Sequence, residues 1–261
     1  MMEKKGISGN VLKMIAVVSM LVDHTAATVL ERLLIQRPLW GPVTYETFDQ
    51  YYNFYSVLRI IGRMAFPIYC FLLVEGFTYT KSKAKYALRL FFFALLSEVP
   101  FDLAFEHSFF YISYNNVFFT LLIGLLVIWA SDCIREKITS DGKAGGRFFA
   151  VGAGKVFLSA AVLLAGCVVA EMVLCTDYGA SGVLAIVIIY LLRENRMAGF
   201  ALAVLALTFL SSSSEIAALL MLIPLYFYNG TRGRQIKYFF YAFYPAHLLI
   251  LSLICYAIGL R

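Results

Sequence analysis

The sequence contains few charged residues, and this scarcity excludes an ordinary soluble domain. Asp, Glu, Lys and Arg make up 15% of its 261 residues, whereas soluble globular domains contain about 25%. Hydrophobic residues account for 61%, against about 45–50% in soluble domains. The net charge is +6, but the chain is too short to hold a nucleic-acid module beside its apolar segments. The composition is typical of an integral membrane protein that does not bind nucleic acid.

The sequence also lacks the local motifs of several enzyme classes. Its five cysteines form no CxxC pair and there is no HExxH motif, so we expect no metal ion. A glycine-rich phosphate loop and a nucleophile-elbow serine are absent as well. The candidate functional residues therefore have to be found among the few ionisable side chains.

Long apolar runs are abundant, and we count nine of them. In hydrocarbon, every backbone amide must be hydrogen-bonded within its own segment, and a helix of about 20 residues spans the bilayer. The sequence therefore predicts an all-α integral membrane protein, a polytopic bundle of about nine transmembrane helices that forms one domain over residues 1–261. The segments cover residues 11–31, 57–80, 86–106, 115–134, 148–171, 179–193, 197–213, 215–229 and 237–259.

The distribution of Lys and Arg predicts the orientation of this bundle. With a cytoplasmic N-terminus, 17 of the 22 Lys and Arg residues lie in or beside the inner loops, and such an excess is typical of the cytoplasmic side. We therefore expect a multi-pass plasma-membrane protein with its C-terminus outside. The aromatic-rich outer loop 32–56 is predicted to form either an interfacial belt or a surface helix beside a substrate entrance.

Ionisable residues at membrane depth indicate where the candidate active site lies, because a charge at a helix centre costs at least about 2.5–3.5 kcal/mol. With a rise of about 1.5 Å per residue, His24 and Glu98 lie at similar depths in their helices. Arg59 and Arg63 are four residues apart and share one helical face. Asp23 lies about 100° around its helix from His24, so we expect it to pair with Arg59 or Arg63.

Two interpretations of these residues remain open. In the first, His24 accepts a proton, because a neutral imidazole is a base near pH 7, and the arginines stabilise a developing oxyanion. In the second, Arg59 and Arg63 form a structural network with Glu98 and Asp102 that holds two helices together. His247, in a stripe of tyrosines, is either part of the site or a buried donor.

Several blocks of the sequence resemble the TraX family of conjugal-transfer membrane proteins. The most specific block is Leu-Arg-Ile-Ile-Gly-Arg-Met-Ala-Phe-Pro-Ile-Tyr at residues 58–69. Others, in the same order along almost the whole chain, are found at residues 12–16, 22–24, 75–77, 85–90, 96–102, 116–120, 177–182 and 241–248.

The resemblance implies an activity, since the family's named member acetylates the amino terminus of a pilin subunit. The wider group of transmembrane acyltransferases takes an acyl group from cytoplasmic acyl-CoA. The resemblance therefore implies that acetyl-CoA is the co-substrate here and that the acceptor is a peptide amine, an amino sugar or a glycan. By this analogy His24 is the catalytic base, and Lys13 replaces the Arg of an Arg-x10-His arrangement in the type 3 acyltransferases.

The predicted site residues are assigned from their depth in the membrane together with this resemblance. Catalysis is assigned to His24, Asp23, Arg59, Arg63 and Glu98. Substrate binding is assigned to Asp102, Asn116, Tyr178, Tyr244 and His247. Binding of the CoA phosphates is assigned to Lys13, Lys81, Lys85 and Arg89.

Two other function classes remain as alternatives. The same buried charges could form the proton relay of a transporter or flippase, although no inverted repeat of the kind found in many transporters is visible. A non-catalytic assembly or anchoring factor would leave the buried His and Arg residues unexplained. The sequence predicts contact with membrane lipid but neither the acceptor nor the oligomeric state.

Overall fold

The computed structural model of the chain describes residues 6–36, 45–141, 148–233 and 237–260, and within these ranges the regular structure is helical. The order of the elements is α1 (Gly9–Thr25), η1 (Ala26–Leu30), α2 (Glu31–Ile35), α3 (Tyr45–Gly62), α4 (Ala65–Tyr79), α5 (Lys83–Phe105), α6 (Val117–Asp141), α7 (Phe148–Val168), η3 (Val169–Val173), α8 (Gly179–Leu191), α9 (Arg196–Leu210), η4 (Ser213–Met221), α10 (Leu222–Tyr226) and α11 (Lys237–Ala257).

The predicted all-helical membrane protein is confirmed, although the number of spans and their orientation stay predictions. In the described part of the chain, five helical stretches are long and apolar enough to cross a membrane. Three further apolar stretches are shorter, at 10–17 residues. The five long stretches are Gly9–Ile35, Tyr45–Tyr79, Val117–Glu136, Gly154–Val173 and Phe239–Ala257.

The second apolar segment, expected as one helix over residues 57–80, is divided in the structure. Helix α3 ends at Gly62 and α4 begins at Ala65. The physical reason is Pro67, whose ring would clash with the carbonyl of Arg63 four residues earlier in a continuous helix. Near the start of a helix the missing N–H of a proline has no cost. Within the outer loop 32–56, residues 45–56 form the beginning of α3, in agreement with the alternative of a helix there, and residues 37–44 lie outside the described residues.

The eighth apolar segment, expected over residues 215–229, is also not a single α-helix. Its first part is the 3-10 helix η4, and only the short α10 follows. The Ser212 hydroxyl accepts a hydrogen bond from the backbone N–H of Ser214 and so caps the start of η4. This segment brings the fully buried Glu215 into the protein interior.

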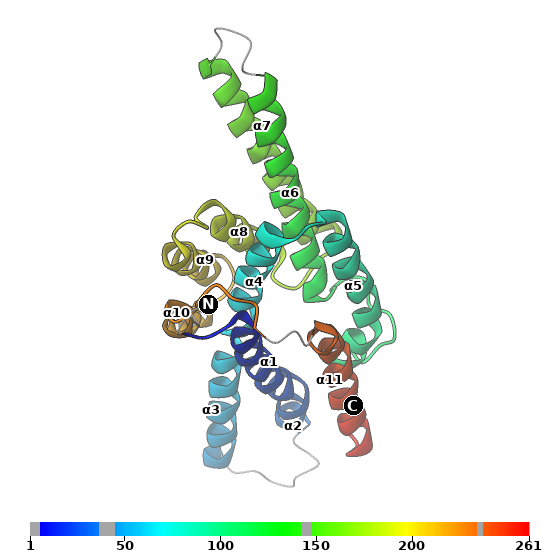
Figure 1. Cartoon of the computed structure of the whole chain (residues 1–261). Coiled ribbons are helices and arrows are strands. Elements are labelled where there is room, and N and C mark those ends of the chain that lie inside the picture. The colour runs from blue at the N-terminus through cyan, green and yellow to red at the C-terminus, as the bar shows by residue number, and fades with distance from the viewer. Residues whose placement is uncertain (1–5, 37–44, 142–147, 234–236, 261) are drawn as a thin grey trace.

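The helices meet around a common core from which α6 and α7 project (Figure 1). Helix α1 packs against α3, α4 and α11, and α11 packs against α5. Helix α8 contacts α4, α6 and α9. The contact between α4 and α8 therefore connects α1, which packs on α4, with α6 and α9, which pack on α8. The polar residues described below lie where α1, the α3–α4 turn and α5 meet the loops before α6 and α8.

Candidate active site

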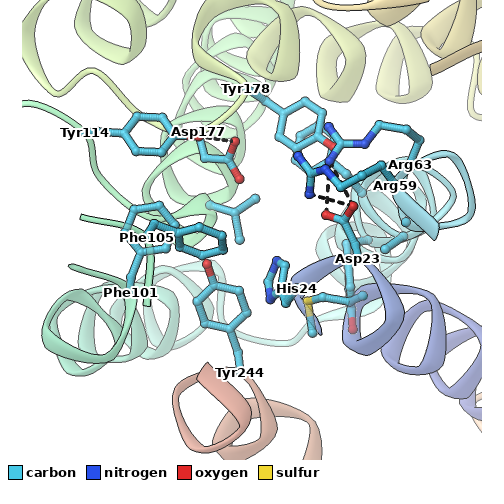
Figure 2. Close-up of a pocket in the computed structure, with 16 residues that line it drawn as sticks. Asp23, His24, Arg59, Arg63, Phe101, Phe105, Tyr114, Asp177, Tyr178 and Tyr244 are labelled. Atoms are coloured by element: carbon cyan, nitrogen blue, oxygen red, sulfur yellow. Dashed lines mark hydrogen bonds and ion pairs between the residues drawn. The ribbon is translucent and has the colours of Figure 1, made fainter. Parts of the chain in front are cut away.

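A pocket of about 130 Å³ contains most of the ionisable residues that the sequence placed at membrane depth (Figure 2). This volume is enough for several water molecules. One side of the pocket is polar and the opposite walls are largely aromatic (Figure 2). The lining residues are Met20, Asp23, His24, Arg59, Gly62, Arg63, Ala65, Phe66, Tyr69, Phe101, Phe105, Tyr114, Val117, Asp177, Tyr178 and Tyr244.

Asp23 binds two arginines at one side of the pocket, Arg59 in α3 and Arg63 in the turn directly after it. Arg59 Nη1 donates to Asp23 Oδ1 at 2.7 Å, and Arg63 Nη2 donates to Asp23 Oδ2 at 3.0 Å. The arginines reach the same carboxylate because residues four apart lie on one helical face. The predicted pairing of Asp23 with these arginines is confirmed.

Arg63 also contacts a second carboxylate, which the sequence analysis did not include. Arg63 Nη1 lies 3.4 Å from Oε1 of Glu215, whose side chain is fully buried. Two guanidinium groups and two carboxylates therefore balance each other's charge. The structural network that we considered between these arginines and Glu98 or Asp102 is wrong, because the arginines pair with Asp23 and Glu215 instead.

Gly62 determines how closely α1 approaches α3 beside this ion-pair cluster. A β carbon at Gly62 would overlap the side chain of Asp23. The hydroxyl of Ser19 donates a hydrogen bond to the carbonyl of Ile61, which joins the two helices next to the same point. Glycine at this position therefore allows the carboxylate to reach both arginines.

His24 lines the pocket and is held from behind by a second histidine. His24 Nδ1 lies 2.7 Å from His247 Nε2, and His247 Nδ1 lies 2.7 Å from the carbonyl oxygen of Phe243. His247 is 5% exposed and does not line the pocket. Its position behind His24 differs from the contact with substrate that we predicted for it.

This chain of three groups determines the tautomers of both neutral rings. A carbonyl oxygen can only accept, so His247 Nδ1 must carry a hydrogen and donate it to Phe243. His247 Nε2 is then an acceptor, and His24 Nδ1 must donate to it. The lone pair of His24 is therefore on Nε2, for which no hydrogen-bond partner is found within the described ranges. The ring presents to the pocket a nitrogen that can accept a proton.

Glu98 and Asn116, both predicted site residues, bind each other outside the pocket lining. Glu98 Oε1 accepts hydrogen bonds from the backbone N–H of Asn116, at 2.9 Å, and from its side-chain amide. The Asn116 amide also donates to the carbonyl oxygen of Ala94 at 2.8 Å, and Asn116 is fully buried. The pair joins α5 to the start of α6.

Asp102, assigned to substrate binding, also lies outside the pocket lining. It is 2% exposed, and its Oδ2 accepts from the backbone N–H of Tyr111 at 2.8 Å. This bond holds the loop between α5 and α6 against the end of α5. The structure therefore separates Glu98 and Asp102 from the residues around His24.

A loop before α8 places Asp177 and Tyr178 on the pocket. Tyr178 has a left-handed backbone conformation (φ 65°) that is uncommon outside glycine, and its ring stacks on Phe66 at 3.7 Å between centroids. Asp177 Oδ1 accepts a hydrogen bond from the hydroxyl of Tyr114 at 3.0 Å. Tyr178 was predicted to bind substrate, whereas Asp177 and Tyr114 were not among the predicted site residues, although Asp177 is the first residue of the block at 177–182.

Aromatic rings surround His24 on its remaining sides. Phe105 and Tyr244 both contact the imidazole edge to face, with ring centroids 5.4 and 5.9 Å away. Tyr244 lines the pocket as predicted, and its side chain is buried. Such walls lower the local dielectric, so that a charge near His24 interacts strongly with the arginines.

The four basic residues predicted to bind CoA lie away from this pocket. Lys13 Nζ is 5.3 Å from the centroid of the Phe240 ring, and the Arg89 guanidinium is 5.6 Å from that of Tyr86. Lys81, two residues before α5, and Lys85, in its first turn, are both exposed. All four lie towards the ends of helices that we predict to be cytoplasmic.

Comparison with known proteins gives a family and a relative of similar length. The model of the TraX protein family matches residues 8–255, a range that includes every residue of the pocket lining. A protein of Dichelobacter nodosus, described as probable fimbrial assembly protein FimC of serogroup H1, is 28% identical over 265 residues. The similarity covers 92% of this chain and 92% of that relative. No solved structure matches the chain.

Proposed function

Because the chain belongs to the TraX family, we propose that it is a membrane-embedded acetyltransferase. It transfers the acetyl group of cytoplasmic acetyl-CoA to an amine or hydroxyl acceptor. The observation that carries this proposal is that His24 Nε2 has no hydrogen-bond partner among the described residues and that His24 lines a pocket shared with two arginines. A base beside cations in an aromatic environment suits proton removal from an acceptor and stabilisation of an oxyanion.

The proposed reaction uses three residues of the pocket. His24 Nε2 removes a proton from the acceptor while the acceptor nitrogen or oxygen attacks the carbonyl carbon of the thioester. Arg59 and Arg63 stabilise the negative charge that develops on the carbonyl oxygen. The C–S bond then breaks, and His24 returns its proton to the departing thiolate. His247 keeps the His24 ring in the required tautomer throughout.

The relative's description supports a class of acceptor. FimC of Dichelobacter nodosus is described as a probable fimbrial assembly protein, and the family is linked to pilin acetylation. We propose that this protein modifies a subunit of a surface fibre while that subunit is in the plasma membrane. Exposed Lys81 and Lys85 are suited to the phosphates of acetyl-CoA, because both carry positive charge.

The test is acetyl transfer by the purified protein in liposomes. Radiolabelled acetyl-CoA is supplied with a panel of acceptors: a peptide with a free amino terminus, glucosamine and glucose. His24→Ala should lower turnover by about 10²–10⁴-fold, the usual contribution of a general base. His107→Ala is the matched control, since His107 is exposed and lies outside the pocket.

Two results would contradict the proposal. Full turnover by His24→Ala would remove His24 from the mechanism. Movement of a solute across the liposome membrane without consumption of acetyl-CoA would favour the transporter or flippase alternative, in which His24 and His247 relay protons.

A further inference from the structure

Among the described residues, Asp177 forms no ion pair, unlike the other two carboxylates of the candidate active site. Asp23 and Glu215 are both engaged by arginines. Asp177 accepts one hydrogen bond at Oδ1, from Tyr114, and among the described residues nothing is bonded to its Oδ2. The carboxylate points into the cavity on the side opposite the ion-pair cluster, as Figure 2 shows.

The charges around the pocket leave one negative charge unbalanced. Arg59 and Arg63 are neutralised by Asp23 and Glu215, and His24 is neutral in the tautomer deduced above. Among the described residues of the pocket, the negative charge of Asp177 is therefore left without an opposite charge paired to it. Asp177 is half-buried, and a carboxylate partly withdrawn from water is stabilised by a nearby positive charge, so the pocket is suited to a positively charged ligand.

The loop that carries Asp177 is held at several points. The backbone N–H of Asp177 donates to the carbonyl oxygen of Asn115 at 2.8 Å, and Asn115 N–H donates to the carbonyl oxygen of Cys175 at 3.0 Å. The hydroxyl of Thr120 donates to the Asp177 carbonyl. Cys175 and Tyr178 both have left-handed backbones, and strained residues of this kind persist where surrounding contacts determine them, often at functional sites.

We propose that Asp177 is the subsite that binds the protonated primary amine of the acceptor, an inference that rests on the proposed acetyl transfer. The ammonium group would donate a hydrogen bond to Oδ2 while Tyr114 remains bonded to Oδ1. A hydroxyl acceptor carries no charge and gains much less from this contact. Asp177 thus selects amines over alcohols.

Electrostatics at Asp177 agrees with this role. Burial raises the pKa of Asp177, and the Tyr114 hydroxyl and Arg63 oppose that change. A bound ammonium group adds a further opposite charge and favours the ionised carboxylate. A bound amine would therefore stabilise the ionised form of Asp177.

In the proposed reaction, each of the three protons of the bound ammonium group has a different destination. His24 Nε2 takes one proton from the ammonium group, and the resulting amine forms a C–N bond with the thioester carbon. The C–S bond breaks, and the thiolate receives the proton held by His24. A second proton leaves the nitrogen for solvent, and the third remains on the amide product.

The experiment compares butylamine with 1-butanol, two probes of similar size that differ in charge. Asp177→Asn keeps an acceptor oxygen for Tyr114 and removes the charge. It should raise the KM for butylamine at least tenfold and raise the KM for 1-butanol much less. Asp49→Asn, the same change at an exposed position of α3, is the matched control and should leave both probes unchanged.

A binding measurement separates this inference from the proposed function. Without acetyl-CoA, butylamine should raise the melting temperature of the detergent-solubilised wild type and of Asp49→Asn but not of Asp177→Asn. If no variant transfers acetyl groups, the enzymatic proposal fails while this shift still tests the subsite. Equal stabilisation of Asp177→Asn, or an unchanged KM for butylamine, would overturn the inference.

Discussion

His24 Nδ1 lies 2.7 Å from His247 Nε2, so a residue of α1 and a residue of α11 share one hydrogen bond. The carbonyl oxygen of Phe243 fixes the direction of that bond. The second histidine therefore contributes to the site without lining the pocket. The hydrogen bond to His24 makes His247 a positioning residue, and the role of His247 can be tested separately from that of His24.

The effect of replacing His247 on turnover should depend on whether the new side chain can accept a hydrogen bond from His24. His247→Gln offers a side-chain oxygen to His24 Nδ1–H and should retain most turnover. His247→Leu has no acceptor and should lower turnover by roughly 10- to 100-fold, the effect of losing a group that orients a functional histidine in metal sites.

Nitrogen NMR provides the measurement for this prediction. The chain has only three histidines, so labelled imidazoles can be assigned by removing His107. Wild type and His247→Gln should show His24 protonated at Nδ1, whereas His247→Leu should show a mixture of tautomers. A single unchanged tautomer in His247→Leu would contradict the positioning role.

Loss of Arg63 should destabilise the protein more than loss of Arg59. Arg63→Met leaves Glu215 buried without a cation, which costs about 3–5 kcal/mol for a broken buried pair. Arg59→Met leaves Asp23 with Arg63 and should cost less. The melting temperature in detergent checks the order of the two variants.

A compensating change tests the cause of that loss. Arg63→Met combined with Glu215→Gln removes both charges and should recover most of the lost thermal stability. Acetyl transfer should stay low in the double variant, because the guanidinium group is still missing. If Glu215→Gln fails to recover thermal stability, the broken Arg63–Glu215 ion pair is not the cause of the stability lost in Arg63→Met.

Glu98 should prove structural, in contrast to the catalytic role that the sequence suggested. Glu98→Gln keeps an acceptor oxygen for Asn116 and should leave turnover within about twofold of wild type. Glu98→Ala leaves buried Asn116 donors unsatisfied, at about 1–3 kcal/mol, and should lower the melting temperature. A large loss of turnover in Glu98→Gln at unchanged melting temperature would instead support the catalytic role predicted from the sequence.

The predicted orientation can be tested by labelling two introduced thiols. Cys133 is the exposed cysteine among the five, so Cys133→Ser gives a background with little reactivity. Phe110→Cys, on the predicted outer loop, should react with a membrane-impermeant maleimide in intact cells. Thr231→Cys, on a predicted inner loop, should react only after permeabilisation. The reverse pattern would invert the topology.

Several features of the fold and the site could be predicted from the sequence alone. Apolar runs imply helices because lipid offers no hydrogen bonds to the backbone. The four-residue spacing of Arg59 and Arg63 places them on one face, and the angle between Asp23 and His24 directs the carboxylate towards those arginines. Local geometry along one helix was sufficient for these inferences.

Other features depended on packing between distant segments. Glu98 and Asp102 have the same four-residue spacing as the arginines, but their helix directs them to Asn116 and Tyr111. Glu215 is the first residue of the eighth apolar segment, and only the tertiary fold brings it to Arg63. A spacing along one helix cannot determine which partner another helix supplies.

The absence of a side chain at Gly62 has a consequence for how the site works. Asp23 and Arg59 are carried by helices in close contact, and Arg63 lies one residue beyond the end of α3. Their dipoles and charges are therefore already directed at the cavity before any ligand arrives, and little reorganisation is needed during reaction. Selection among ligands then depends on which molecule fits a fixed arrangement of charge.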